Sequence, residues 1–425
     1  MMDGGEASSF RRCSVTLLSL VPGAYFCFHQ RVARVAPNFS EKDLQQWKLI
    51  ADFRACLVPL LGSAPLDSSW SDPRRRLECA DYLCLFLFAL VNPVVATLRG
   101  ICAATQLQRV QEEVSSHYAS LGSLSEAQHL LDPALLEPLI ESLGAQIHGP
   151  LPADPRAAWQ EWFARDSSLF AALPRMAWAH YGGGQARASG APHRAVRLHV
   201  SFHLLDDKPA RAHVTAGRVC ERKSLRQQLE RGATYVGDRY YGEDYKLFAE
   251  LEKKGCRFVL RLRDEAVLQV EEELSLREED GAAHVSRDAW VRLGRHERDR
   301  TARLRVITIQ SATAGALRLV TNIPPEELSA AQVGAMYRRR WQIEGFFRWV
   351  KCVLGCRHFL AESPRGVTLQ LYLALIAGLM LHLLLGRRPN KRLMERLRFY
   401  LLGWASAGEL AQATRQALNA SAKKS

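Results

Sequence analysis

The chain has 425 residues, enough for about three domains at roughly 150 residues each, and its composition is 48% hydrophobic and 24% charged. This composition excludes a disordered, collagen-like or disulfide-stapled chain. Lysine and arginine number 57 against 44 aspartates and glutamates, which gives a formal net charge of +13. A chain this basic attracts polyanions, so nucleic acid and an anionic membrane surface are both candidate partners.

The amino-terminal third of the chain is predicted to be helical. From Ser40 to about Leu143 apolar residues recur at spacings of three and four, which is the helical period. The apolar run at 83–98 is too short to span a membrane and contains Asn92-Pro93, so it predicts a buried helix that stops near Pro93. The segment HGPLPADP at 148–155 combines Pro, Gly and Asp and predicts a domain boundary.

Strand patterns begin after this boundary. Alternating or short apolar segments predict strands at 195–205, 211–215, 233–237 and 256–262, with an amphipathic helix at 245–254 between the last two. Strands that alternate with a helix indicate an α/β sheet. The charge-rich region 264–323 contains two further strand candidates, 304–310 and 317–323, and is interpreted as a mainly β insertion.

Two other apolar runs raise the question of a membrane. The run at 13–28 follows two arginines but contains Pro22-Gly23 and is followed by no small-residue cleavage site, so a signal peptide is not expected. The run at 367–386 has the length of a membrane span and is flanked by arginines. A helix buried in a large core has the same composition, and we favour the core helix; a membrane protein built around this run remains the alternative.

The ten cysteines form no CxxC pair, which is typical of small apolar residues in a reducing compartment. Cys352, Cys356 and His358 come closest to a metal cluster, but no upstream pair completes a structural zinc site. Zinc is therefore not expected.

Pro324-Pro325 opens a predicted long helix from Glu326 to about Leu354. On a helical wheel Tyr337, Arg340, Glu344 and Lys351 fall within a stripe of about 60°, flanked by Trp341 and Arg348. The opposite face is apolar: Ile343, Phe346, Phe347, Val350 and Leu354. The stripe is either a solvated charged face with weak ion pairs or a metal-binding carboxylate beside phosphates and unstacked bases, and its two aromatic residues favour the second interpretation.

The spacing Tyr-x2-Arg-x3-Glu-x6-Lys in YRRRWQIEGFFRWVK resembles the signature of bacterial DDE transposases of the insertion-sequence-four family. Three other segments resemble parts of the same family. DYLCLFLFALVNPVVATLRGICAAT is similar to its amino-terminal helical region, YVGDRYYG followed by YKLF to the strand-turn-helix that carries its second Asp, and LRFYLLGWAS to its carboxy-terminal end. The resemblance extends from about residue 40 to 405.

The resemblance implies a catalytic triad of Asp166, Asp238 and Glu344. Asp238 also follows the strand ATYVG directly, and the carboxyl ends of strands are where open α/β sheets place their ligand sites. Asp166 departs from the family pattern, because Ser167 stands where the family has Gly. Asp206 and Asp207 are the fallback candidates for the first Asp, although their DDKP context predicts a hairpin turn.

A second departure follows Asp238, where Tyr240 stands in place of the family's Gly or Ala. This departure is expected to change the geometry of the local turn more than that of the metal site.

Three carboxylates without His or Cys select a hard divalent cation, Mg²⁺ or Mn²⁺, and two such ions are expected to serve phosphoryl transfer. By resemblance the reaction is cut-and-paste DNA transposition. The expected partners are transposon-end double-stranded DNA and target DNA, bound by a homodimer, in the bacterial cytoplasm at the nucleoid and not in a membrane. The expected DNA contacts are Tyr337, Arg340, Trp341, Arg348 and Lys351.

The implied fold is an α/β, ribonuclease-H-like catalytic core interrupted by the β insertion. It is preceded by an all-α domain and followed by a helical tail. The predicted layout is an extension at 1–39, a helical DNA-binding domain at 40–150, a catalytic domain at 156–263 and 324–386, a β insertion at 264–323 and a basic tail at 387–425. A catalytically decayed relative that binds DNA without cutting it would have the same fold and remains the alternative.

Overall fold

The computed structural model describes residues 48–148, 161–182, 194–295, 301–311, 315–356 and 358–422. The predicted extension at 1–39 and the apolar run at 13–28 lie outside these residues. Within 48–148 the described structure is helical and contains no strand, which confirms the predicted all-α region for that part of the chain. Its helices are α2 (Lys48–Ser63), α3 (Cys79–Val91), α4 (Leu98–Ala104), α5 (Gln108–Glu113), α6 (Leu121–Leu130) and α7 (Glu137–Ala145), with short 3₁₀ turns η1 (Ser68–Ser71) and η2 (Pro133–Leu136).

Helix α3 is the predicted buried helix that stops before Pro93. All of its 13 residues are buried. Its C-cap, Asn92, has extended backbone angles of φ −83° and ψ 127°, because the residue before a proline is disfavoured in the helical region. The prediction for this run is confirmed.

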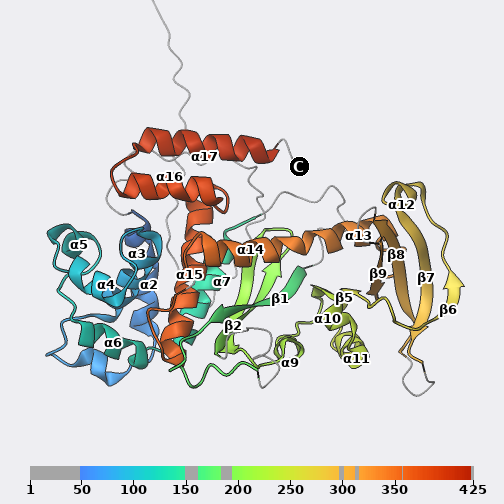
Figure 1. Ribbon diagram of the computed structural model, residues 1–425, viewed down its shortest axis with the longest axis horizontal. Coiled ribbons are helices and arrows are strands. Elements are labelled where there is room, and N and C mark those ends of the chain that lie inside the picture. Colours follow the sequence, from blue (N-terminus) through green and yellow to red (C-terminus); the bar gives the residue numbers. More distant parts are fainter. Residues whose placement is uncertain are drawn as a thin grey trace, which may run out of the picture.

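A single nine-stranded sheet runs from the middle of the molecule to its right-hand edge in Figure 1, in the order β3-β2-β1-β4-β5-β9-β8-β7-β6. The first three strands pair antiparallel, whereas β4 is parallel to β1 and β5 is parallel to β4. The remaining strands continue the sheet antiparallel through the pairing of β9 with β5. The strands are β1 (Trp162–Ala171), β2 (Ala195–His203), β3 (Lys208–Ala216), β4 (Thr234–Gly237), β5 (Arg257–Arg261), β6 (Leu268–Glu273), β7 (Val285–Leu293), β8 (Leu304–Ser311) and β9 (Gly315–Thr321).

The region predicted as a mainly β insertion contains β6 to β9 and one short helix, α12 (Glu278–Ala282). A buried ion pair holds this region to the next segment of the chain. Arg305 on β8 is 1% exposed and donates to Asp288 on β7 at 2.6 Å and 2.9 Å. The same guanidinium donates to the carbonyl oxygens of Ile323 and Leu328, just before the helix that follows the sheet.

Two apolar clusters cover opposite faces of the sheet. One contains Ala164 and Val236 together with the amino-terminal helices and the carboxy-terminal helices from α13 onward. The other contains Phe163 and Tyr235 with the helices on the far face, as expected when successive side chains of a strand alternate between faces. Those far-face helices are α9 (Glu221–Arg226), α10 (Arg239–Gly242) and α11 (Tyr245–Lys253).

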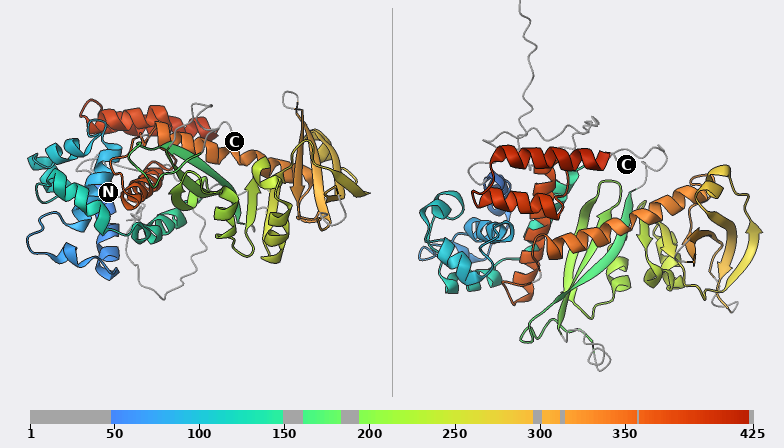
Figure 2. Two further views of the ribbon diagram at one scale, coloured as in Figure 1. Left: turned by 60° about the horizontal axis from the view of Figure 1, so that its bottom comes forward. Right: turned by 45° about the horizontal axis from the view of Figure 1, so that its top comes forward.

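The helix predicted from Glu326 begins four residues later and is interrupted. Ser329 and Gln332 form a reciprocal capping box that starts α13 at Ala330, so Pro324-Pro325 lies in the turn before the helix. At Arg340 the backbone makes a tighter step, because its N–H bonds the carbonyl of Tyr337. The structure therefore has two helices running end to end (Figure 2), α13 (Ala330–Arg339) and α14 (Trp341–Cys352).

Helix α15 (Pro364–Leu385) is a core helix, as predicted for the run at 367–386. Among the described residues it is the one helix long and apolar enough to cross a membrane, and 78% of its most apolar window is buried inside the protein. It packs against α3, α6, α7 and β3 and approaches α14 closely, since a Cβ at Gly378 would lie 2.9 Å from the Trp349 ring. Two further helices follow, α16 (Lys391–Leu401) and α17 (Ala407–Ala422).

The Arg305–Asp288 pair yields a stability prediction. Asp288→Ala leaves a buried guanidinium without its counter-ion, so we expect unfolding in urea to become easier by about 3–5 kcal/mol. Glu273→Ala removes the partner of Arg287, in a pair whose side chains are 43% and 57% exposed. It should change the free energy of unfolding by less than about 1 kcal/mol. Equal losses in the two variants would contradict this account of the buried pair.

Candidate active site

Asp166 and Asp238 lie side by side at one level of the sheet. Asp166 is in β1, and Asp238 directly follows β4. These strands run parallel with Ala164 opposite Val236, so two more residues along each strand bring Asp166 beside Asp238. Neighbouring strands are about 4.8 Å apart. The two aspartates predicted from the sequence therefore belong to one cluster.

The Asp238 side chain caps a short helix. Its Oδ1 accepts a hydrogen bond from the Tyr240 backbone N–H at 3.0 Å, at the start of α10. Helix α10 lies against β5 at Gly242, where a Cβ would be 1.9 Å from the Arg261 carbonyl oxygen. Glycine is therefore required at position 242, and this contact sets the position of the turn that holds Asp238.

Glu344 reaches the cluster through Arg340. The Arg340 guanidinium donates to Glu344 Oε1 at 2.8 Å and its other terminal nitrogen lies 4.0 Å from Asp166 Oδ2. The Arg340 side chain is only 9% exposed, so these charges interact across a poorly solvated space. One cation thus bridges the carboxylates of β1 and α14.

The surroundings of Asp166 disfavour its charged form. Burial, followed by the negative charge of Glu221 and more weakly that of Asp238, raises the pKa of Asp166 to about 7. Arg340 acts in the opposite direction. An additional positive charge would stabilise the ionised form of a carboxyl group in this position. Hard carboxylate oxygens are the donors that Mg²⁺ and Mn²⁺ prefer.

Across the described ranges, no three His, Cys, Asp or Glu side chains are gathered closely enough to hold one metal ion. This statement includes Cys352, Cys356 and His358 as well as the carboxylate cluster. At the cluster the reason is visible, because Glu344 is turned toward Arg340. The chemistry of Asp166, Asp238 and Glu344 suits a divalent cation, while Arg340 balances part of the charge of Asp166 and Glu344.

The polar stripe predicted on the helix is only partly exposed, which corrects the expectation that all its members face solvent or DNA. Tyr337 is 6% exposed and Arg340 8%, whereas Trp341 is 62% exposed. Arg348 is exposed as well, and Lys351 Nζ lies 4.9 Å from the centre of the Phe170 ring. Tyr337 turns inward because α13 packs against β5 and β7 while α14 packs against β1. The alternative of a solvated charged face is therefore wrong for Tyr337 and Arg340.

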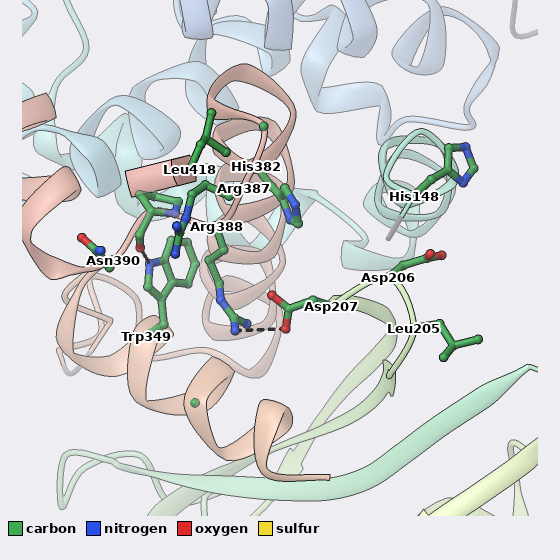
Figure 3. Close-up of a pocket in the computed structure, with 13 residues that line it drawn as sticks. His148, Leu205, Asp206, Asp207, Trp349, His382, Arg387, Arg388, Asn390 and Leu418 are labelled. Carbon is green, nitrogen blue, oxygen red and sulfur yellow. Dashed lines mark hydrogen bonds and ion pairs between the residues drawn. The ribbon is translucent and has the colours of Figure 1, made fainter. Parts of the chain in front are cut away.

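Asp206 and Asp207, the fallback candidates, lie in the turn between β2 and β3, as their sequence context predicts. This turn borders a cavity of about 380 Å³ beside the ends of α15 and α17 (Figure 3). Asp207 accepts from Arg388 at 3.2 Å, and Asp206 lies 2.7 Å from Lys208 Nζ. The cavity touches α14 at Gly345 and Trp349, which lie about 100° and 140° around the helix from Glu344. These aspartates thus serve ion pairs away from the cluster.

The cations at 387–398, at the start of the predicted basic tail, are divided between the interior and the surface of the protein. Arg398 donates to the Val353 carbonyl oxygen at 2.7 Å, and Arg388 lies over the rings of Phe202 and Phe346. Arg392 and Arg396 are exposed on α16. Part of the positive charge of this block therefore supports the fold.

Sequence reasoning missed the residues behind Asp166. Ser167 Oγ donates to Glu221 Oε1 at 2.6 Å, and Arg197 contacts both groups. Glu221 starts α9, 54 positions further along the chain than Ser167. No local spacing pattern links them, because their contact arises from sheet pairing and from the packing of α9 on the far face.

Comparison with known proteins identifies the family of this chain. Residues 160–380 match the family described as the transposase DDE domain. This match covers more than half of the 425 residues, and the chain belongs to this family.

Two bacterial proteins illustrate the relationship. The chain is 31% identical over 220 residues to a protein named as transposase y4zB from Sinorhizobium fredii, a match covering 51% of this chain and 60% of that protein. It is 30% identical over 207 residues to one named as a transposase for insertion sequence element IS5377 from Geobacillus stearothermophilus, covering 49% and 52%. The chain thus spans less than two thirds of the length of either relative.

A solved piggyBac transposase synaptic complex with hairpin DNA aligns with 88% of this chain and 80% of its own. The sequence identity is 12% and the TM-score 0.39, and a likeness this weak supports no conclusion.

The close contact of α10 with β5 can be tested. Gly242→Ala places a methyl group against the Arg261 carbonyl, so we expect a loss of about 1–3 kcal/mol in the free energy of unfolding and displacement of the Asp238 turn. Gly281→Ala is the matched control, since nothing lies within 4 Å of a Cβ at that helical position. Urea unfolding of both variants checks the prediction, and equal stability of the two would refute it.

Proposed function

We propose that this protein is a transposase that cuts and joins DNA at the ends of its insertion sequence by metal-dependent phosphodiester hydrolysis and strand transfer. The observation that carries the proposal is the bridge from Glu344 through Arg340 to Asp166, with Asp238 at the same level of the next strand. These are the three carboxylates that the family resemblance selects.

We further propose that residues 156–263 and 324–386 form a ribonuclease-H-like core. It consists of strands β1 to β5 and the helices that these two ranges contain. An antiparallel three-stranded unit flanked by two parallel strands, with helices on both faces, supports this assignment. Residues 264–323 are then an insertion, residues 40–150 a helical DNA-binding domain, and residues 387–425 a basic tail.

Asp166, Asp238 and Glu344 would hold Mg²⁺ or Mn²⁺, with two ions in the active complex. Such ions activate the attacking oxygen and stabilise the leaving oxygen of a phosphodiester. The carboxylates themselves supply negative charge from three separate segments of the chain. Arg340 balances part of this charge in the absence of substrate and is placed to contact a phosphate oxygen beside the cluster.

The side chains around the cluster have distinct parts in this proposal. Trp341 is 62% exposed and offers a ring on which an unstacked base can stack. Arg348 and Lys351, on the same helix, are proposed to contact backbone phosphates. Tyr337 is buried, and its ring centre lies 5.8 Å from the Arg340 guanidinium. We therefore propose that Tyr337 supports Arg340 and that its own expected contact with a phosphate is made from this buried position.

The proposed partners are the transposon-end duplex and the target DNA. The net charge of +13 supports an anionic partner. The exposed cations of α16 lie outside the carboxylate cluster and offer further contacts for DNA phosphates. A homodimer in the DNA complex and a cytoplasmic location at the nucleoid, without a membrane, rest on the family resemblance.

Glu344→Gln tests the proposed triad. The amide keeps the shape of the side chain and can still accept from Arg340, but it loses the charge that a divalent cation requires. We expect cleavage of a duplex carrying the element's terminal sequence to fall by more than about 100-fold, since even outer-shell partners of a metal typically contribute 10–100-fold.

Glu272→Gln is the control for this experiment, because Glu272 is 54% exposed on β6 and pairs with Arg303. The Glu272→Gln variant should cleave DNA at the same rate as the parent chain. Equal cleavage by Glu344→Gln and the parent would exclude Glu344 from the reaction. DNA binding by the parent without cleavage would instead favour the decayed relative.

Removal of divalent metal should stop cleavage but not DNA binding. Chelation with EDTA is expected to abolish strand cutting, and added Mg²⁺ or Mn²⁺ should restore it, because the carboxylates need a cation to act on a phosphodiester. Gel-shift and cleavage assays on the same samples separate the two steps. Cleavage that persists at full rate in EDTA would overturn the metal-dependent mechanism.

A further inference from the structure

Glu221 lies behind the carboxylate cluster, on the opposite face of the sheet from α14. Successive residues of a strand face opposite sides: Asp166 faces Arg340, while Ser167 faces α9 and donates to Glu221 Oε1 at 2.6 Å. The side chains of Glu221 and its ion-pair partner Arg197 are each 17% exposed. This is a mostly enclosed network and not a flexible surface pair.

The same glutamate also contacts the element that carries Asp238. Its second oxygen, Oε2, accepts from the Tyr241 hydroxyl at 3.4 Å. Tyr241 is 3% exposed and belongs to α10, the helix that Asp238 caps. One carboxylate therefore contacts both the residue after Asp166 and the helix that follows Asp238.

Arg197 completes the network from the neighbouring strand. It lies on β2, donates to Ser167 Oγ at 2.8 Å and to the Gly217 carbonyl at 3.0 Å, and pairs with Glu221. The arginine compensates the charge of Glu221 and limits its motion, so Glu221 has a defined position relative to β1.

We propose that Glu221 is a positioning residue that sets the separation and the local charge of Asp166 and Asp238 for the divalent cation. It acts through Ser167 on one side and Tyr241 on the other. Ser167, which stands where the resembling family has Gly, supplies the hydroxyl that makes this connection in the present chain. The inference rests on the proposed function, because it assumes that these aspartates bind metal.

Mn²⁺ binding to the full chain tests the proposal without requiring catalysis. The free Mn²⁺ signal in electron paramagnetic resonance gives the affinity of the parent, Ser167→Ala, Glu221→Gln and Glu221→Ala. We expect Glu221→Ala to weaken Mn²⁺ binding by about tenfold or more, as for other outer-shell partners of metals, and Glu221→Gln to weaken it by a smaller factor because the amide can still accept from Ser167. The Mn²⁺ concentration for half-maximal cleavage should shift in parallel.

A double-mutant cycle checks the path through Ser167. If Glu221 acts through that hydroxyl, the Ser167→Ala, Glu221→Ala double variant should bind Mn²⁺ within about twofold of Glu221→Ala alone, since contacting residues are not additive. Glu250→Gln is the matched control. It removes the carboxylate charge from another ion pair of α9, with Arg226, and should leave Mn²⁺ affinity unchanged.

Measurements of unfolding in urea distinguish a positioning role of Glu221 from a purely structural one. If Glu221→Ala and Ser167→Ala lower the urea midpoint but bind Mn²⁺ like the parent, Glu221 is only structural and the inference is wrong. If Glu221→Ala fails to fold, an unchanged Mn²⁺ affinity in both Ser167→Ala and Tyr241→Phe, the two residues through which Glu221 acts, is sufficient to overturn it. A parent chain that neither binds Mn²⁺ nor cuts DNA would overturn the proposed function itself, which is a different outcome.

Discussion

The interaction on which the site depends is the placement of one buried guanidinium among carboxylates from distant segments. Asp166, Asp238 and Glu344 would repel one another in a poorly solvated space. Arg340, 8% exposed, donates to Glu344 and lies 4.0 Å from Asp166, so it offsets part of that repulsion. The tighter backbone step lies at the same residue, and Tyr337 beside it is buried as well.

Local patterns predicted the parts of the site that depend on local rules. The strand before Asp238, the wheel position of Glu344 and the apolar face of α14 all follow from periodicity, and each is present in the structure. The start of α13 was misplaced because Pro324-Pro325 is a strong local signal, whereas the capping box at Ser329 depends on side-chain bonds. The break at Arg340 and the burial of Tyr337 could not be predicted, because a helical wheel does not show which face meets a sheet.

The residues behind the sheet illustrate a different limit. Ser167 departs from the family pattern, since a glycine is usual at this position. In the structure its hydroxyl joins Glu221 and Arg197, groups brought together by strand pairing and by helix packing across the sheet. A departure from a motif can therefore be compensated by residues that no spacing rule relates to it.

The burial of α15 also has a consequence for the order of events during synthesis. This helix packs against the amino-terminal helices and β3 and abuts α14 through Gly378 and Trp349. Helix α14, which carries Glu344, thus packs against a segment that ends at Leu385 as well as against β1. A nascent or truncated chain that stops before α15 has the two aspartates but only one of these two supports of the glutamate. Completion of the carboxylate cluster is consequently expected to follow the synthesis of α15, well after both aspartates have been made.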